Sequence, residues 1–419
     1  MSSRNQRPVG KLSAAVLFYI LAIGSGIARS FSVAFDVVAL NLTDIDPITY
    51  GFMAQWVSFG ISFILLITLS IRISSDGRTR KLGYHLDPDF ERMRLLPRRP
   101  MLYLVCGGLV AGISTFFYYF LVEQTNITTV LPYGQLVIIY LLLGDLVAEK
   151  DTPTIVEVQC IVSILFGVLL VGVTPGGFDI LALAIVLGPM NVSSALFTYF
   201  QRKTKRYEIR KGLRVDALNM RLWSLFFLNL SMSVTMLPFM GLATWNVMSE
   251  YFAPLFWLMA GSSLTIFVSM VLYVRALGKG SMSIVNSLSA VSVLVGIPLT
   301  LIGNWIVPGA FGQVSGDTFI WILRVLGILL VLIGIVALQA ADVRSFVFIK
   351  VKPHTGDLLP DLFDVKGVET AAAIAGKHDY ILSIKSRSLA KTRNLVLKRI
   401  QQIPGIEEIE TQVIIKDFR

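Results

Sequence analysis

Charged residues are scarce in this chain of 419 residues: only 15% are Asp, Glu, Lys or Arg, whereas 54% are hydrophobic. A mean hydropathy of +0.70 is too high for a soluble globular protein of this length. The formal net charge of +10 does not indicate a nucleic-acid partner, because the basic residues lie in short segments between long apolar runs. We therefore predict a protein whose solvent is the lipid bilayer.

Cysteine and histidine are also rare. The two cysteines, Cys106 and Cys160, lie inside apolar runs, and the histidines, His85, His354 and His378, are far apart. This spacing matches neither a disulfide framework nor a metal site. The sequence also lacks a Ser/His/Asp triad, a phosphate-binding loop and a dinucleotide fingerprint on a credible element. We therefore predict no metal, no cofactor and no enzymatic activity.

Long apolar segments fill most of the first 341 residues. A membrane-spanning helix needs about 20 mostly apolar residues, because the hydrocarbon core is about 30 Å thick and a helix rises about 1.5 Å per residue. Ten segments meet this requirement, at residues 12–40, 49–71, 101–122, 126–147, 154–173, 179–201, 219–240, 254–275, 281–303 and 318–341. The first is longer than a signal-peptide core and lacks a clear cleavage site, so we expect it to be retained. The sequence predicts an all-α polytopic membrane protein with ten transmembrane helices.

Basic residues are confined to alternate loops between these segments. The basic loops contain Arg72, Arg78, Arg80, Lys81, Arg92, Arg94, Arg98, Arg99, Lys150, Arg202, Lys203, Lys205, Arg206, Arg210, Lys211, Arg214 and Lys279. The other loops have no Lys or Arg. Because short loops rich in Lys and Arg stay in the cytoplasm, we predict a multi-pass protein of the cell membrane with both termini cytoplasmic and a cytoplasmic N-terminal segment at 1–11.

The ten segments fall into two related halves. A shift of 155 residues places residues 125–128 on 280–283 and Glu149 on Asn304. Five spans is an odd number, so the second copy enters the bilayer in the opposite sense, which is the inverted-repeat plan of many secondary transporters. The alternative, that any two apolar helical segments look alike under a shift, stays open. We predict one five-helix repeat at 12–173 and a second at 174–341.

A motif shared by the two halves carries a family resemblance. In residues 119–149 a helix ends in a short turn, an Asn-Ile-Thr-Thr run starts the next helix, a proline follows, and an apolar run ends near an acid. Residues 276–304 repeat the pattern, but with Asn304 in place of the acid. The chain thus resembles the drug/metabolite transporter superfamily, in its ten-helix EamA-type branch. Gly167, Gly327 and Gly334 match that family's close packing of helices.

After residue 341 the composition changes abruptly to polar and charged. Alternating and helical periodicities predict the order βαββαβ, a ferredoxin-like α+β domain at 342–419. The expected strands are 345–351, 371–375, 380–384 and 410–415, and the expected helices are 356–364 and 389–402.

This C-terminal segment resembles a second family. Residues 376–381 followed by Ile384, and residues 400–406 with their Ile-Pro-Gly, match the Lrp/AsnC or RAM effector-sensing domain of leucine-responsive regulatory proteins. No helix-turn-helix precedes it, so the resemblance implies sensing or dimerisation without DNA binding. It implies an amino-acid effector and a homodimer formed through this domain. The effector-binding residues expected from the resemblance are Gly376, His378, Asp379 and Tyr380.

Arg29 is the charge that stands out within the membrane segments. It lies about seventeen residues into the first span, where a charged group costs about 2.5 to 3.5 kcal/mol on insertion scales. Asp36 follows two turns later on the same helix face. Arg29 either meets a carboxylate or phosphate on a substrate, or it snorkels or pairs with Asp36.

Neutral polar residues in the spans are further candidates, because they hydrogen-bond a solute without the cost of an unpaired charge. The predicted substrate-binding residues besides Arg29 are Asn126, Tyr133, Gln135, Asn191, Ser194, Asn229, Asn286 and Ser289. Each could instead bridge two helices. Glu123, at an outer turn, is the candidate for proton coupling, since a carboxylate at a cavity mouth can have a raised pKa.

Together these observations predict a secondary transporter of a small metabolite, an amino acid or a related compound, that works by alternating access. The C-terminal domain would regulate it by binding an amino acid. The expected partners are the small-molecule substrate, membrane lipid and a second copy of the chain. Two alternatives stay open: a lipid-linked flippase of the same superfamily, and a membrane sensor that no longer transports.

Overall fold

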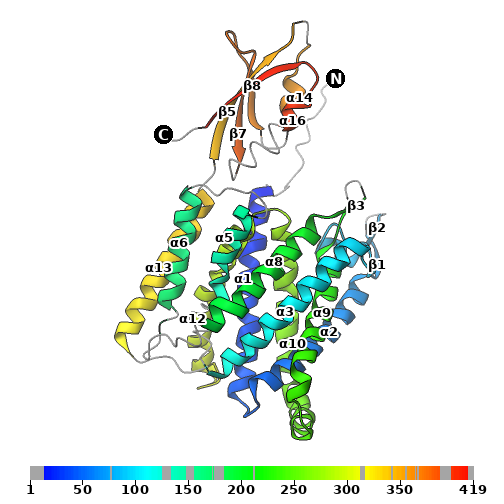
Figure 1. The fold of residues 1–419 in the computed structure, drawn as a ribbon, viewed down its shortest axis with the longest axis vertical. Helices are drawn as coiled ribbons and strands as arrows, with labels where there is room; N and C mark the ends of the chain where they lie inside the picture. Colours follow the sequence, from blue (N-terminus) through cyan, green and yellow to red (C-terminus); the bar gives the residue numbers. More distant parts are fainter. Residues whose placement is uncertain are drawn as a thin grey trace. The chain divides into compact units, whose positions relative to one another are not determined.

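The computed structural model describes residues 14–75, 78–124, 134–147, 155–171, 173, 184–210, 213–311, 317–340, 343–353, 356–363, 365, 368–386 and 398–413. They form two compact units (Figure 1). The first, Met1–Gly144 with Ser163–Leu332, is a helical bundle. The second, Asp145–Val162 with Ile333–Arg419, contains a four-stranded sheet.

Helices account for most of the described chain. They are α1 (Ala14–Asn41), α2 (Pro47–Leu69), α3 (Arg98–Gln124), α5 (Val137–Val147), α6 (Ile155–Val171), α8 (Asn191–Arg206), α9 (Ala217–Met236), α10 (Leu242–Leu277), α11 (Met282–Ser289), α12 (Val291–Ile306) and α13 (Thr318–Ala340). Short elements join them: β1 (Arg72–Ser75), β2 (Arg78–Lys81), η1 (Leu82–His85), a π-helical turn η2 (Val186–Met190), β3 (Glu208–Arg210), β4 (Leu213–Arg214) and η3 (Leu237–Phe239).

Among the described residues, six helices are long and apolar enough to cross a membrane. They are α1, α2, α3, α10, the pair α11 and α12 taken together, and α13. These helices fit the predicted multi-pass membrane protein. The other four predicted spans fall on α5, α6, η2 with α8, and α9, each of which falls short in length or hydropathy over its described part. The count of ten spans therefore stays a prediction.

Two of the predicted spans are interrupted. In the fourth, a turn at Leu136 separates Gly134 and Gln135 from α5. In the ninth, Ala290 separates α11 from α12 with φ −62° and ψ −10°. A third irregularity is η2, where Gly188 has non-helical angles and is followed by Pro189. A proline removes one backbone donor and its ring clashes with the preceding turn, which accounts for the irregularity beside Pro189.

Helix α1 packs directly against the interruption in the ninth span. A Cβ added at Gly26 would lie 2.4 Å from the carbonyl oxygen of Ser289. One turn later the Ser30 hydroxyl donates to the carbonyl oxygen of Ser292 at 2.9 Å. This bond satisfies an acceptor beside the break, which would otherwise be costly in an apolar interior. The contact therefore depends on a bare backbone at Gly26.

We predict that Gly26→Ala destabilises the bundle, because the new methyl group meets backbone that cannot move aside. Overpacking of this kind costs about 1 to 3 kcal/mol. The matched control is Gly60→Ala in α2, where an added Cβ has nothing within 4 Å. In thermal unfolding of the detergent-solubilised chain, Gly26→Ala should lower the melting temperature and Gly60→Ala should not. Equal melting temperatures for the two variants would contradict the contact.

A buried ion cluster joins the end of α8 to the start of α9. The Lys205 ammonium donates to Asp87, Asp89 and the carbonyl oxygen of Val215, each at 2.9 Å. Asp87 also accepts the backbone N–H of Ala217 at 2.6 Å. A buried ammonium is stable only when its hydrogen bonds are satisfied, and here three oxygens surround it. The cluster fixes the loop after η1 against the connection between α8 and α9.

Asp216 caps α9 beside this cluster. Its carboxylate accepts the backbone N–H of Asn219 at 2.7 Å, and the Asn219 side-chain amide at 3.0 and 3.1 Å. The Arg94 guanidinium lies 3.8 Å away. Burial raises the pKa of Asp216 to about 6, although the hydrogen bonds from Asn219 act in the opposite direction. The cap therefore titrates near the lower end of the physiological range.

Replacement of Asp216 by Asn should remove this titration while keeping a good N-cap. Because the folded-state pKa is raised above 3.8, the stability contributed by the protonated carboxyl is complete below about pH 4 and is lost as the pH rises through about 6. Relative to Asp216→Asn, the wild-type chain should lose up to about 3 kcal/mol between pH 4 and pH 7. Melting temperatures of both proteins across that range test this. If the melting temperature of the wild type, relative to that of Asp216→Asn, stayed constant or rose with pH, burial would not control the pKa of this carboxyl.

The sheet domain has the predicted βαββαβ order. Its elements are β5 (Val343–Val351), α14 (Leu359–Phe363), β6 (Val368–Ala373), β7 (Tyr380–Ser386), α16 (Lys398–Gln401) and β8 (Ile406–Val413). The strands are antiparallel in the order β6-β7-β5-β8. Its core includes Val347 and Ile349 of β5, Leu382 and Ile384 of β7, and Leu362 of α14. Strand β6 begins three residues before the prediction, and residues 389–397 of the predicted second helix lie outside the described residues.

Candidate functional site

A polar cavity of about 180 Å³ lies inside the helical bundle. This is room for a small solute, since one buried water needs about 10 to 15 Å³ on a comparable measure. Helices α1, α2, α3, α8, α9 and α10 supply its walls. The polar lining residues are Arg29, Ser32, Asp36, Gln55, Ser58, Ser114, Thr115, Tyr118, Tyr119, Asn191, Ser194, Arg221, Ser262 and Ser263. Such convergence of polar groups in a buried, otherwise apolar cavity is typical of a ligand site.

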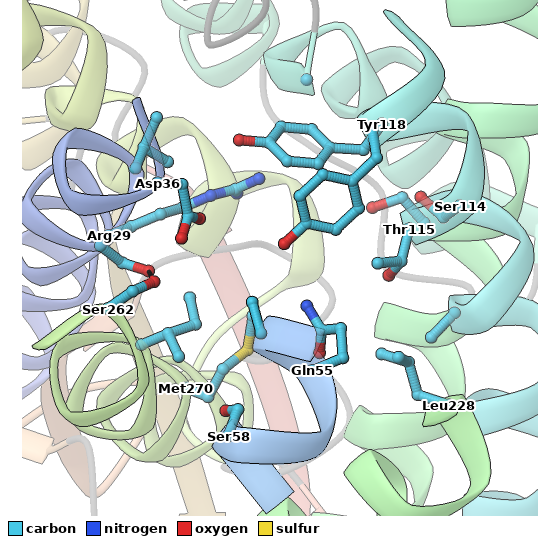
Figure 2. Close-up of a pocket in the computed structure, with 18 of the residues that line it drawn as sticks. Arg29, Asp36, Gln55, Ser58, Ser114, Thr115, Tyr118, Leu228, Ser262 and Met270 are labelled. Atoms are coloured by element: carbon cyan, nitrogen blue, oxygen red, sulfur yellow. Dashed lines mark hydrogen bonds between the residues drawn. The ribbon is translucent and has the colours of Figure 1, made fainter. Parts of the chain in front are cut away.

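Arg29 and Asp36 occupy one wall of this cavity. They are seven residues apart, so both lie on the same face of α1, and Figure 2 shows both side chains within the cavity opposite Tyr118 of α3. Within the described part of the chain they form no ion pair with each other, and Arg29 has no hydrogen-bond partner. Asp36 accepts a hydrogen bond from the Tyr50 hydroxyl at 2.8 Å and another from the Ser262 hydroxyl. The wall thus offers one cation and one anion that are available to a solute.

The interrupted fourth span approaches the same arginine. A Cβ added at Gly134 would lie 3.7 Å from Nη2 of Arg29. The backbone of Gly134, which carries no side chain, therefore faces the Arg29 guanidinium at the interruption. Discontinuous helices at mid-membrane depth form the solute sites of many transporters, because their free backbone groups can bind a polar solute.

Aromatic and hydroxyl groups line the facing walls. Tyr118 and Tyr119 pack edge to face with ring centroids 5.1 Å apart, and both line the cavity. Figure 2 places Ser114 and Thr115 on α3 beside Tyr118, and Ser58 on α2 below Gln55. The Ser114 hydroxyl donates to the carbonyl oxygen of Met190 at 3.0 Å, at the end of the π-helical turn. These walls can stack on an apolar group and hydrogen-bond a polar one.

A smaller cavity of about 80 Å³ shares Arg29, Ser194, Phe197 and Met270 with the first. Its remaining walls come from Ser25, Val137, Thr198, Gln201, Ser269, Tyr273, Asn286 and Ser289. Because Arg29 lines both cavities, its guanidinium lies where they meet.

A chain of hydrogen bonds crosses the bundle beside the smaller cavity. The Gln135 amide donates to the Ser292 hydroxyl and accepts from the Asn286 amide, each at 3.2 Å. The Tyr273 hydroxyl lies 3.4 Å from Asn286 Oδ1 and 3.4 Å from the Thr198 hydroxyl. This series of hydrogen bonds connects residues of both interrupted spans. It gives Gln135 and Asn286 the bridging role that was the alternative to solute binding.

The predicted substrate-binding residues thus divide into three groups. Those that line a cavity are Arg29, Asn191, Ser194, Asn286 and Ser289. Gln135 is buried and bonded to Asn286, and Asn229 donates to the carbonyl oxygen of Gln55 at 2.8 Å; neither lines the two cavities described above. Asn126, Tyr133 and the side chain of Glu123 lie outside the described residues. The binding role of every one of them stays a prediction.

Three groups in the site were not among the predicted residues. Asp36 was considered only as a partner of Arg29, although its place on the same helix face was a sufficient signal. Arg221 was not singled out; it falls near the end of a predicted span, where an arginine can reach the interface. Gln55, in the first half of the second span, is as polar as Asn229 and was not singled out.

The predicted effector residues lie in the turn before β7 and at its start. Gly376 has φ +148°, a backbone conformation that L side chains rarely adopt. His378 lies 3.2 Å from the Glu410 carboxylate and beside the Phe348 ring, with centroids 5.4 Å apart. The Asp379 carboxylate accepts the backbone N–H of Val351 at 2.8 Å, and the Tyr380 side chain belongs to the core. Two of the four contact another ionisable side chain, since the Tyr380 hydroxyl also donates to the Asp357 carboxylate at 3.4 Å.

Comparison with known proteins identifies the sheet domain. Residues 344–419 match the family of the Lrp/AsnC ligand binding domain. The C-terminal part of the chain is therefore a Lrp/AsnC ligand-binding domain, and the prediction made from residues 376–384 and 400–406 is confirmed. No curated protein matches the chain in sequence.

One solved structure, described only as "Crystal structure of protein", resembles the chain with a TM-score of 0.50 and 15% sequence identity. The match covers 78% of this chain and 96% of that one. At this identity the likeness shows a shared fold alone. The resemblance of the helical part to the drug/metabolite transporter superfamily stays a prediction.

Proposed function

We propose that the chain is a secondary transporter of an amino acid or a closely related solute, regulated by its C-terminal Lrp/AsnC domain. In this proposal ten spans form two inverted five-helix repeats of the EamA type, in the cell membrane, with both termini in the cytoplasm. The central cavity is the solute site, and access to it alternates between the two sides.

The observation that carries the proposal is the pair of charges on α1. A free amino acid presents a carboxylate and an ammonium group within a few bonds of each other. Arg29 can bind the carboxylate through its planar guanidinium, and Asp36 can accept the ammonium. Both charges are already present in the cavity and neither is neutralised by the other. Since unpaired charges inside a membrane are costly, a zwitterion that satisfies both is the solute that the cavity favours.

The interruptions in the fourth and ninth spans support the inverted repeat. A shift of 155 residues moves the turn at Leu136 to position 291, next to the break at Ala290. The shift was chosen from residue types, so agreement in backbone geometry is an independent observation. Paired discontinuous helices around one central site are a property of inverted-repeat transporters.

The transport proposal predicts that Arg29→Ala and Asp36→Asn lower amino-acid flux in proteoliposomes. Each substitution leaves one end of the bound zwitterion unpaired, which costs about 2 kcal/mol or more and so at least about 30-fold in kcat/KM. The matched controls are Arg99→Ala and Asp44→Asn, whose side chains are exposed. Counterflow of labelled amino acids measures the effect. Wild-type flux in both site variants would rule out this pair as the solute site, and a wild-type chain without any amino-acid flux would rule out the transporter.

The Lrp/AsnC domain supports regulation, since its family is described by ligand binding. A ligand on this domain can bias the bundle only by its difference in affinity for two conformations. The coupling in such systems is typically about 5- to 150-fold. The Lrp/AsnC domain therefore changes the rate of solute transport and need not take part in transport itself.

Deletion of residues 343–419 should leave flux intact and remove its regulation. In the full chain, the effector amino acid on the side of the membrane that carries the domain should change the initial rate by about fivefold or more. The truncated chain should show no such change. Glu369→Gln, at an exposed position of β6, is the control for a mild change in the domain. Loss of all flux on truncation, with the bundle still folded, would instead favour the membrane sensor.

A further inference from the structure

Arg221 on α9 is a second guanidinium in the central cavity. Its side chain is only 5% exposed, and it lines the cavity with Arg29 and Asp36. Within the described residues its Nε has no hydrogen-bond partner, and the guanidinium forms no ion pair. A buried arginine without an anion is rarely tolerated in a membrane protein unless it has a functional ligand.

The carboxylates nearest along the chain and at the adjoining ion cluster are engaged elsewhere. Asp216, five residues earlier on the same chain, caps α9 and is bonded to Asn219. Asp87 and Asp89 both accept from Lys205. The carboxylate that shares the cavity, Asp36, is the partner assigned above to the ammonium group of the solute. The fold therefore supplies Arg221 with no anion among the described residues.

A second unpaired group lies in the same cavity. The Ser58 hydroxyl of α2 is buried and has no hydrogen-bond partner within the described part of the chain, and Figure 2 places Ser58 at the α2 wall. A buried hydroxyl and a buried guanidinium, both unsatisfied in one cavity, make a donor pair of the kind that binds a carboxylate or a phosphate. Ser58 of α2 and Arg221 of α9 therefore both indicate an anion site, and this argument does not use α1.

The charges of the cavity do not balance for a simple zwitterion. Arg29 and Arg221 contribute two positive charges and Asp36 one negative charge among the lining residues. A neutral amino acid would satisfy Arg29 and Asp36 and leave Arg221 unpaired. The cavity also extends along two turns of α1, from Arg29 to Asp36, and two turns of α9, from Arg221 to Leu228, about 10 Å in each case. It can therefore hold an elongated solute with charged groups at both ends.

We propose that Arg221, with Ser58, binds a second anionic group of the solute, so that the preferred substrate is an amino acid with an acidic side chain. This rests on the proposed transport of amino acids and narrows it to a substrate class. One unit of negative charge on the side chain makes the loaded cavity neutral. The second anion is either a carboxylate or a phosphate, since both accept the same donors.

The test compares L-glutamate with L-glutamine, which have nearly the same shape and differ in one charge. The full-length chain is reconstituted in liposomes, and kcat/KM for counterflow is measured for wild type, Arg221→Gln and Arg221→Lys. We expect the wild-type glutamate-to-glutamine ratio to exceed about 10 and to fall about tenfold or more in Arg221→Gln, with Arg221→Lys intermediate, because a lost charge partner acts on the charged solute alone. Arg99→Gln is the control for a change at an exposed arginine.

The outcomes separate this inference from the transport proposal. L-Alanine and L-leucine report amino-acid transport in general, and O-phospho-L-serine beside L-aspartate and L-glutamate decides between phosphate and carboxylate. The melting temperature and gel-filtration profile of Arg221→Gln in detergent show whether the variant is folded. If Arg221→Gln does not fold, the glutamate-to-glutamine ratio of wild type and Arg221→Lys decides. Neutral amino acids carried as well as acidic ones, or an unchanged ratio in Arg221→Gln, would overturn the inference and leave transport standing.

Discussion

The close approach of α1 to two interrupted helices is the constraint on which the site depends. Gly26 lets the carbonyl oxygen of Ser289 come to a distance that a Cβ would forbid, and Ser30 then satisfies the carbonyl oxygen of Ser292. One residue before Ser30, Arg29 turns into the cavity and lies beside the bare backbone of Gly134. A single turn of α1 therefore joins both halves of the bundle and carries the cation of the proposed site. The geometry of the solute site and the packing of the fold cannot be separated at this turn.

Much of the fold could be predicted because the bilayer acts on local composition. A span needs a fixed length of apolar sequence, so runs such as those of α2 and α13 are visible without any knowledge of tertiary contacts. The sheet domain was visible for a similar reason, since alternation at period two identifies a strand wherever one face is buried. The limits of α10 were less predictable: its 36 residues exceed what spanning requires, and length beyond the hydrocarbon leaves no signal in hydropathy.

The site was only partly predictable, because burial of a polar residue is decided by packing between segments. Arg29 was conspicuous because it lies about seventeen residues into the first span. Arg221 resembled an arginine at the end of a span, but it is only 5% exposed and lines the central cavity. Asn229 was as polar and as central as Asn191, but it faces the backbone of Gln55 rather than the cavity. The sequence period identifies a helix, whereas the neighbouring helices determine which face lines the cavity.

The Lys205 cluster sets a limit on how the bundle can move. Separating a buried ion pair typically costs about 3 to 5 kcal/mol, and inverting a two-state population from 1:99 to 99:1 requires about 5.5 kcal/mol. A movement that broke this cluster would therefore consume most of the free energy that a solute can contribute. In the proposed transport cycle, the connection between α8 and α9 and the loop after η1 should thus move as one rigid piece. The hinge should lie at the interrupted helices, where no buried ion pair among the described residues has to be broken.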